Sequence, residues 1–325
     1  MFRWLVSGAL FTATLFAQQP TTIRVDVRLA QVIVTVKNRA GELVGSLTKN
    51  DFEVYDNGAK QEIAVFARQT EQPVSVALLI DTSGSTAKEL KFEIESASKF
   101  LHALLAEGNA RDAVALYSFD YDVTLEHDFT HNFAGLERQL RQIRGSAGTS
   151  LYVALVHSSR HLEGREGRKV VVVVTDGGDT TSGNTDLHAA VREAQLADAV
   201  AYPIVVLPIT NPAGRNTGGE NALAFLAQNT GGRTFYPGNA RELDKVFADI
   251  ISELRTQYVL GYYPHDVPLT KNPFHKLEVR VKSPDLRPSY RQGYYGEVEG
   301  GSADEAARPV VNPERKKSDI RKKER

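Results

Sequence analysis

Short apolar runs alternate with amphipathic segments through the middle of the chain. Four of these runs are typical of strands buried on both faces of a sheet, at residues 74–80, 113–119, 170–175 and 201–208. The other segments carry apolar residues at helical spacing, at residues 88–105, 133–143, 151–161, 186–199, 221–228 and 241–255. This alternation predicts an α/β fold, a doubly wound and mostly parallel sheet with helices on both faces.

Two shorter segments complete the predicted sheet. Residues 123–128 follow the strand at 113–119 after a tight turn, so we expect them to form an antiparallel edge strand. Residues 233–236 predict one more short strand, between the last two helices.

The last predicted helix has the clearest periodicity. Its apolar residues form one stripe at i, i+3, i+4, i+7, i+8 and i+11, namely Leu243, Val246, Phe247, Ile250, Ile251 and Leu254. Burying six such side chains at roughly 1.5–3 kcal/mol each gives about 9–18 kcal/mol, an upper bound before chain entropy is subtracted. We therefore expect this helix to dock on the sheet.

The segments on either side of this unit follow a strand pattern. Before it, we expect strands at residues 23–29, 32–36, 51–55 and 63–66, with Asn57-Gly58 as a hairpin turn between the last two. After it, strands are expected at residues 258–264, 276–281 and 290–295. Because each set is too small to be stable alone, we predict that the two sets pair into one small antiparallel β domain. Two independent β appendages are the alternative.

The N-terminus is typical of an export signal. Arg3 precedes an apolar stretch at residues 5–17, which is shorter than the roughly 20 residues of a membrane-spanning helix. Cleavage after Ala17 is plausible, and an uncleaved interfacial anchor is the alternative. We therefore expect an exported protein, periplasmic or extracellular, with no transmembrane helix in the mature chain. The absence of cysteine means that a folded core, not disulfides, must hold it together.

These patterns divide the chain into five regions. They are a signal peptide at 1–17, an N-terminal β unit at 22–70, an α/β domain at 74–256, C-terminal strands at 257–296 and a disordered basic tail at 297–325. The formal net charge of −1 argues against a general nucleic-acid binder, because the basic residues that might suggest one are concentrated in the tail.

The loop after the first buried strand carries three oxygen-bearing side chains. Residues 81–85 read Asp-Thr-Ser-Gly-Ser, which places Asp81, Ser83 and Ser85 on a tight turn. A carboxylate and two hydroxyls are hard oxygen ligands, which suit Mg²⁺ or Mn²⁺ far better than zinc or copper. The motif is weak by itself, because Ser, Thr and Asp at such a position also cap helices.

Two further loops strengthen the metal interpretation. Thr149 precedes the helix at 151–161, and Asp176 follows the apolar run at 170–174. In an open α/β sheet, ligands bind beyond the carboxyl ends of the strands. We therefore predict a site for one divalent ion, Mg²⁺ or Mn²⁺, made by Asp81, Ser83, Ser85, Thr149 and Asp176. The open position of an octahedral ion could be filled by an Asp or Glu of a protein partner.

These five residues resemble the metal-ion-dependent adhesion site of von Willebrand factor A domains, such as integrin I domains, without departure from the family motif. The resemblance covers about residues 74–255. The flanking residues 45–58, 258–264 and 291–295 are similar to the exported bacterial von Willebrand factor A-related proteins known mostly from Acidobacteria. The resemblance implies a Rossmann-like α/β fold and a non-enzymatic, adhesion-type module that binds protein through the metal. It supplies no partner.

Two other functions stay open. A hydrolase or phosphatase could use the same ion as a Lewis acid, but no serine lies in a G-x-S-x-G motif and no P-loop lysine follows a Gly-rich turn. His157 and His161 share a helix face without an acidic motif between them, so we expect both on the surface. A structural envelope protein with a stabilising metal site is the other possibility. Asp179 is expected to be a solvated loop acid.

Overall fold

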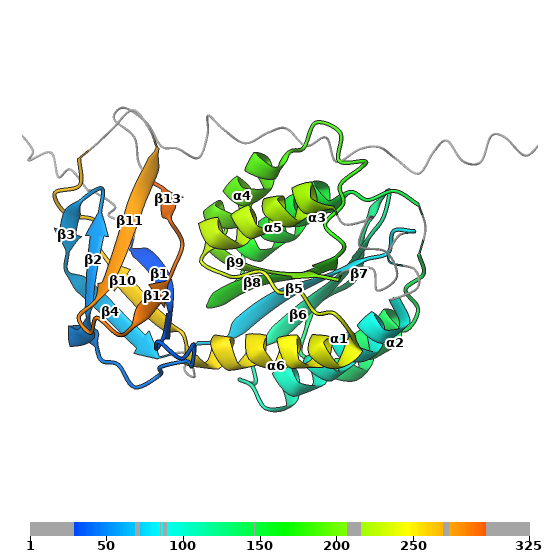
Figure 1. The fold of residues 1–325 in the computed structure, drawn as a ribbon, viewed down its shortest axis with the longest axis horizontal. Helices are drawn as coiled ribbons and strands as arrows, with labels where there is room; N and C mark the ends of the chain where they lie inside the picture. The colour runs from blue at the N-terminus through cyan, green and yellow to red at the C-terminus, as the bar shows by residue number, and fades with distance from the viewer. Residues whose placement is uncertain are drawn as a thin grey trace, which may run out of the picture.

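The computed structural model describes residues 29–68, 72–84, 86, 90–145, 147–206, 216–268 and 273–296. The predicted signal peptide, the predicted basic tail and Ser85 lie outside these residues. The described chain forms one five-stranded sheet covered by helices and, at one end of it, two four-stranded sheets (Figure 1). No helix in this part of the chain is long and apolar enough to span a membrane.

The central sheet has the strand order β7-β6-β5-β8-β9. Its parallel strands are β5 (Val74–Asp81), β6 (Ala113–Phe119), β8 (Arg168–Thr175) and β9 (Ala199–Val205). At one edge, β7 (Val123–Thr130) pairs antiparallel with β6, as expected from the tight turn before it. Every residue of β5 and β6 is buried, because both faces of the sheet are covered. The predicted fold class is confirmed.

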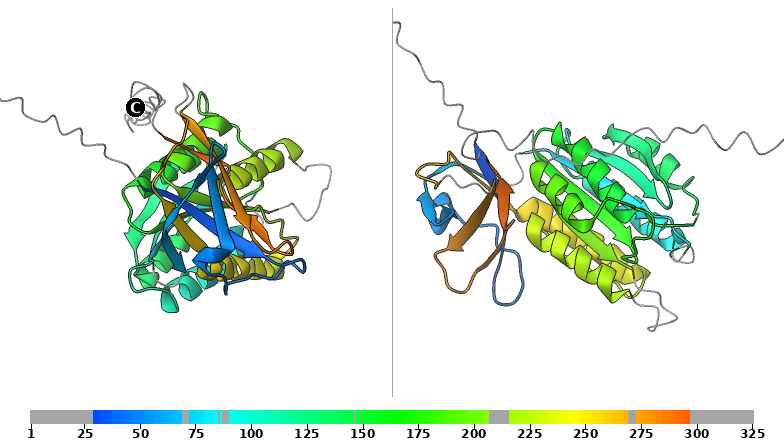
Figure 2. Two further views of the ribbon diagram at one scale, coloured as in Figure 1. Left: turned by 90° about the vertical axis from the view of Figure 1, so that its left-hand side faces the viewer. Right: turned by 90° about the horizontal axis from the view of Figure 1, so that it is seen from above.

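Helices cover the two faces of this sheet in groups of three (Figures 1 and 2). One face carries α1 (Leu90–Ala106), α2 (Phe133–Leu140) and α6 (Ala240–Thr256), and the other carries α3 (Leu151–Glu163), α4 (Leu187–Leu196) and α5 (Thr217–Thr230). Alternate strand residues face the two groups, so that Leu78 packs with the first and Leu79 with the second. The whole apolar stripe of α6 is buried in the first group, which confirms its predicted docking.

The predicted strand at residues 233–236 is reduced to a single bridge. Phe235 bridges to Ile204, and its backbone exchanges hydrogen bonds of 2.8 and 2.9 Å with Val205 and Pro203 of β9. Phe235 is nevertheless buried in the core. The apolar pattern therefore indicated burial correctly, but the segment pairs at only one position.

Strands from both ends of the chain form a small antiparallel β domain. Its two sheets have the orders β12-β1-β10-β4 and β13-β11-β2-β3. The strands are β1 (Ala30–Lys37), β2 (Phe52–Asp56), β3 (Ala59–Gln61), β4 (Ile63–Arg68), β10 (Tyr258–Tyr262), β11 (Phe274–Val281), β12 (Arg287–Ser289) and β13 (Gly293–Tyr295). Because β1 pairs with β10 and β2 pairs with β11, the N- and C-terminal strands form one domain, not two appendages.

The hairpin turn lies where the sequence predicts it, but its second strand is not the expected one. Asn57 and Gly58 both have positive φ, 46° and 85°, and connect β2 to the short β3, after a 3-10 helix at Lys49–Asp51. The predicted partner at residues 63–66 belongs to β4, which crosses to the other sheet and pairs with β10. Ile63 thereby enters the core shared by both sheets.

Candidate metal centre

Asp81 is the last residue of β5 and is fully buried. Its Oδ2 accepts a hydrogen bond from Thr175 Oγ1 at 2.5 Å, and its Oδ1 accepts one from the Ser83 N–H at 2.9 Å. The Ser83 side chain also bonds to this carboxylate. Thr86 Oγ1 donates to the Asp81 carbonyl at 3.0 Å, which closes the turn. The carboxylate is therefore held in one position at the strand end.

Asp176 lies at the end of the neighbouring strand. Because Ile80 pairs with Val174 in parallel register, Asp176 follows β8 beside the end of β5. Its Oδ1 accepts a hydrogen bond from the Gly178 N–H at 3.0 Å. Burial, together with the charge of Asp176, raises the pKa of Asp81 to about 6 against the lowering effect of the hydrogen bonds. A cation beside both carboxylates would favour their ionised forms.

Thr149 is tied to the loop that follows β8. Its N–H donates to Thr180 Oγ1 at 2.9 Å, and its carbonyl accepts from the N–H groups of Thr180 and Thr181 at 2.8 and 3.1 Å. Its hydroxyl makes no hydrogen bond with another described residue. The same segment also contacts the loop after β5, because a Cβ on Gly145 would lie 2.9 Å from the Thr82 carbonyl oxygen. The three predicted loops therefore converge.

The ligand atoms that these loops offer are all oxygens. No group of three or more His, Cys, Asp and Glu side chains in the described part of the chain is arranged to hold a metal ion. The predicted set contains only two carboxylates, Asp81 and Asp176, and its other members are hydroxyls. Such a set suits Mg²⁺ or Mn²⁺ and not zinc, so the residues fit the predicted ion. That they bind it stays a prediction, and Ser85 lies outside the described residues.

We expected Asp179 to be a solvated loop acid, but the structure shows otherwise. It is half-buried, and its Oδ1 accepts hydrogen bonds from the Tyr152 N–H at 3.2 Å and from Ser182 Oγ at 2.5 Å. The carboxylate thus satisfies a free N–H group in the first turn of α3, the helix that follows Thr149.

His161 is also not a free surface residue. It is half-buried on α3, with Nδ1 2.5 Å from the Tyr117 hydroxyl and Nε2 3.1 Å from Asp128. His157 is exposed, as expected. The two histidines therefore do not act as a pair.

Thr175 is the site residue that the sequence did not indicate. Besides donating to Asp81, its hydroxyl accepts a hydrogen bond from the Gly177 N–H at 3.0 Å and so connects the ends of β5 and β8. A hydroxyl directly after the buried apolar run at residues 170–174 is the signal that could have revealed it, because a buried hydroxyl needs a partner.

Comparison with known proteins agrees with this architecture. Residues 76–179, which include all five predicted ligands, match the family model of the von Willebrand factor type A domain. No curated protein matches the chain.

Three solved structures are among those similar to parts of this chain. The vWF domain of the type V pili tip protein Mfa5 from Porphyromonas gingivalis is 18% identical with a TM-score of 0.46, over 56% of this chain and 94% of that one. BatB from Bacteroides thetaiotaomicron is 20% identical with a TM-score of 0.43, over 56% and 98%. A von Willebrand factor type A protein from Catenulispora acidiphila is 12% identical with a TM-score of 0.49, over 84% and 66%. The family-model match identifies residues 76–179 of this chain as a von Willebrand factor type A domain.

Proposed function

We propose that this protein is an exported, non-enzymatic binding module. In this proposal one Mg²⁺ or Mn²⁺ ion is held at the end of the central sheet by Asp81, Ser83, Ser85, Thr149 and Asp176. An Asp or Glu of a protein partner completes the coordination, so that the ion bridges the two proteins.

The observation that carries the proposal is the pair of carboxylates at the ends of β5 and β8. Asp81 has no exposed surface, yet the polar groups around it hold its carboxylate oxygens in place. Burial and the neighbouring Asp176 both oppose its ionisation. A divalent ion would offset this cost, and its bond to a partner's carboxylate would be strong because the site is shielded from water.

The residues of the three loops favour binding over catalysis. Residues 81–86, 145–150 and 176–181 contain no His, Lys, Cys or Tyr, so only their carboxylates and hydroxyls could act as a general base or nucleophile. In this proposal Asp81 and Asp176 are occupied by the ion, and Asp179 bonds to Tyr152 and Ser182. His161, a possible base on the adjacent helix, already bonds to Tyr117 and Asp128. These residues support a role in which the ion holds a ligand without reacting with it.

Thermal unfolding with Mg²⁺, Mn²⁺ or EDTA tests the metal site directly. A ligand that binds only the folded state must raise the midpoint. We expect a rise in the wild type that is lost in Asp81→Ala and retained in Asp122→Asn, which removes an exposed carboxylate nearby. A metal effect that survives Asp81→Ala would contradict the site.

Partner capture separates the proposed function from its alternatives. Proteins retained from envelope and culture fractions in Mg²⁺, released by EDTA and absent with Asp81→Ala would support metal-bridged binding. Turnover of a phosphoester or ester panel that is lost in Asp176→Ala would instead show a hydrolase. Tight metal binding without any retained protein would indicate a structural metal site.

A further inference from the structure

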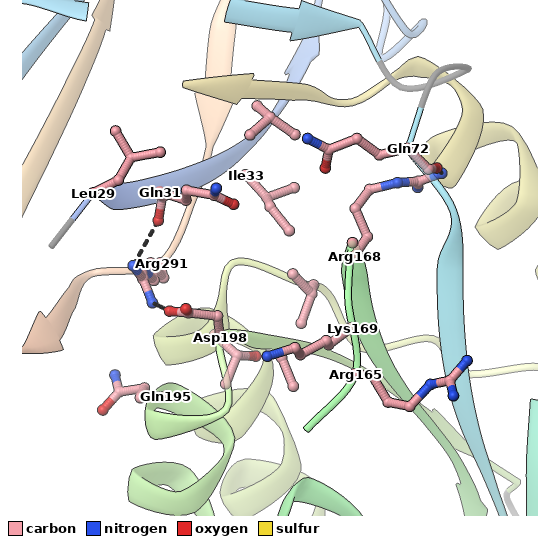
Figure 3. A pocket seen from close by; sticks show the side chains of 15 residues that line it. Leu29, Gln31, Ile33, Gln72, Arg165, Arg168, Lys169, Gln195, Asp198 and Arg291 are labelled. Carbon is pink, nitrogen blue, oxygen red and sulfur yellow. Dashed lines mark hydrogen bonds and ion pairs between the residues drawn. The ribbon is translucent and has the colours of Figure 1, made fainter. Parts of the chain in front are cut away.

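A polar cavity lies between the β domain and the central sheet, at the end opposite to the candidate metal centre. Its volume is about 270 Å³. The central sheet contributes the starts of β8 and β9, including Lys169 and Ala199, and the β domain contributes Gln31 and Arg291 (Figure 3). Asp81 and Asp176 stand at the other ends of the parallel strands, so this cavity is separate from the predicted metal site.

The charges that line the cavity are strongly unequal. Four cationic side chains line it, Arg165, Arg168, Lys169 and Arg291. Asp198 is the one carboxylate among the lining residues. The other polar side chains there are uncharged amides and a hydroxyl, from Gln31, Gln72, Gln195 and Thr230. Among the lining residues, cations therefore outnumber carboxylates by four to one.

Arg291 is the central cation of this cavity. It is only 7% exposed, and its guanidinium donates from Nη1 to Asp198 and from Nη2 to the Gln31 carbonyl at 2.6 Å (Figure 3). Its Nε–H is buried and has no acceptor among the described residues. The Arg291 charge is therefore fixed at the cavity wall, where Asp198 partly balances it.

Two further cations bond only to uncharged groups in the described part of the chain. Arg165 Nε donates to the Ser75 hydroxyl at 3.0 Å, and its guanidinium lies over the Phe129 ring. Lys169 Nζ donates to the Glu163 carbonyl at 2.9 Å. Both are half-buried, which weakens the screening of their charge by water.

The fourth cation, Arg168, is fixed in place, and its charge interacts with that of Asp112. Arg168 donates from Nη1 to the carbonyl of Leu254, near the end of α6, at 2.7 Å and from Nη2 to the Gln72 carbonyl at 3.3 Å. Because these bonds anchor the guanidinium, we do not expect it to move when an anion binds.

We propose that this cavity binds a compact, doubly charged oxyanion, a phosphate or a small phosphomonoester. The volume is below that of typical pockets for larger ligands, which favours a compact molecule. Several oxygens on one centre can accept from the point charge of Lys169 and from the N–H groups of Arg291 that Asp198 and Gln31 leave unused. Because Arg291 belongs to the β domain and Lys169 to the central sheet, the bound anion holds the two domains together.

The test is titration calorimetry of the full chain with inorganic phosphate and with glycerol phosphate. Both titrations run in EDTA, so that no metal at the other end of the sheet binds phosphate, and at constant ionic strength set with chloride. We expect Lys169→Ala to weaken binding by about tenfold or more, because a charge-assisted bond is lost. Lys245→Ala, which removes an exposed lysine of α6, should leave it unchanged.

Asp198→Asn gives the opposite and more diagnostic result. Asp198 has a positive φ of 56°, which Asn tolerates well, so the backbone should be retained. The substitution frees Nη1 of Arg291 and removes the one lining carboxylate, so we expect binding to become tighter by about tenfold. If Lys169→Ala does not fold, Arg165→Gln replaces it in the comparison.

The two ligands distinguish the source of the anion. Equal binding of both identifies bare phosphate chemistry, and binding of glycerol phosphate alone identifies an organic phosphomonoester. Either result supports the proposal when it depends on Lys169 and Asp198 as expected. The proposal is overturned if neither ligand binds, or if binding is the same in wild type, Lys169→Ala and Asp198→Asn.

Discussion

The buried carboxylate of Asp81 makes a prediction about the metal-free protein. Burial raises its pKa to about 6 from 3.8, so its ionisation is more costly in the folded state. The protonated Asp81 carboxyl contributes its full stabilisation below the pKa that Asp81 has in the unfolded chain. This contribution is lost as the pH rises through the pKa of Asp81 in the folded protein. In EDTA, we expect Asp81→Asn to gain stability relative to wild type by about 1–2 kcal/mol between about pH 5 and about pH 7.5. Chemical denaturation at the two pH values measures this difference.

Asp122→Asn is the matched control for that measurement, because Asp122 is exposed in the loop between β6 and β7. Its stability difference from wild type should not change with pH. A divalent ion should reverse the ranking at the higher pH, since it stabilises ionised Asp81 in the wild type alone. A pH-independent difference for Asp81→Asn would show that its carboxyl ionises normally in the folded state.

The site residues that follow strand ends could be predicted from the sequence. The residues that hold them in place by hydrogen bonds could not. Asp81 and Asp176 directly follow apolar runs, so the strand pattern alone assigns them to one edge of the sheet. Thr175 bonds to Asp81 and Thr180 bonds to Thr149, and each partner is more than thirty positions away in the sequence. Such contacts depend on which strands become neighbours, and local periodicity carries no information about that order.

The strands of the β domain are joined by one buried polar cluster. Asp56, on β2, accepts hydrogen bonds from the hydroxyls of Tyr262 on β10 and Tyr294 on β13 at 2.8 and 2.6 Å. His275 on β11 pairs with it at 3.0 Å. Burial alone would raise the pKa of Asp56, but the bonds from His275, Tyr294 and Tyr262 together lower it. The ionised carboxylate therefore connects strands of both sheets.

We expect Asp56→Ala to destabilise the β domain by about 3–5 kcal/mol, because it leaves buried polar groups without their common partner. Since the pKa is lowered, the stabilisation is present above the unfolded pKa and is lost as pH falls through the folded pKa. Hydrogen exchange of β10 and β11 amides measures the effect. Glu278→Gln, an exposed change on β11, serves as the control and should cost less than about 1 kcal/mol. Equal protection in the two variants would contradict the role of the cluster.

The sequence predicted element types better than element partners. The hairpin turn at Asn57-Gly58 was predictable because both residues tolerate positive φ. The crossing of β4 to the other sheet was not predictable, because no turn signal in residues 59–68 marks a break between two strands. In the structure Glu62 separates β3 from β4, and the two strands pair in different sheets. The strand predicted at residues 233–236 is only a single bridge for a related reason. A buried residue such as Phe235 gives the same sequence pattern whether or not its neighbours pair as a strand.

At the scale of the whole molecule, the von Willebrand factor type A domain is inserted into the β domain. The start of β5 and the end of α6 lie at the same end of the central sheet, next to the β domain (Figure 1). There Gln257 donates to the Tyr202 hydroxyl at 2.7 Å and to Thr35 Oγ1 at 3.3 Å. The candidate metal centre and the proposed anion cavity lie at opposite ends of this sheet. A partner bound at the metal would therefore leave the junction between the domains accessible.

This chain order predicts the result of removing residues 258–296. The truncation deletes β10 and β12, both neighbours of β1, and also β11, the neighbour of β2. Of the first four strands, only the β2–β3 hairpin keeps a partner, and an isolated hairpin is marginal in water. Hydrogen exchange should therefore show rapid exchange throughout residues 30–68, while β5 and β8 stay protected.

Because the predicted ligands lie outside the deleted residues, the truncated chain should still be stabilised by Mg²⁺ or Mn²⁺. It should lose phosphate binding, because Arg291 is gone. Protected β1 amides in the truncated chain would show that the N-terminal strands fold without their C-terminal partners.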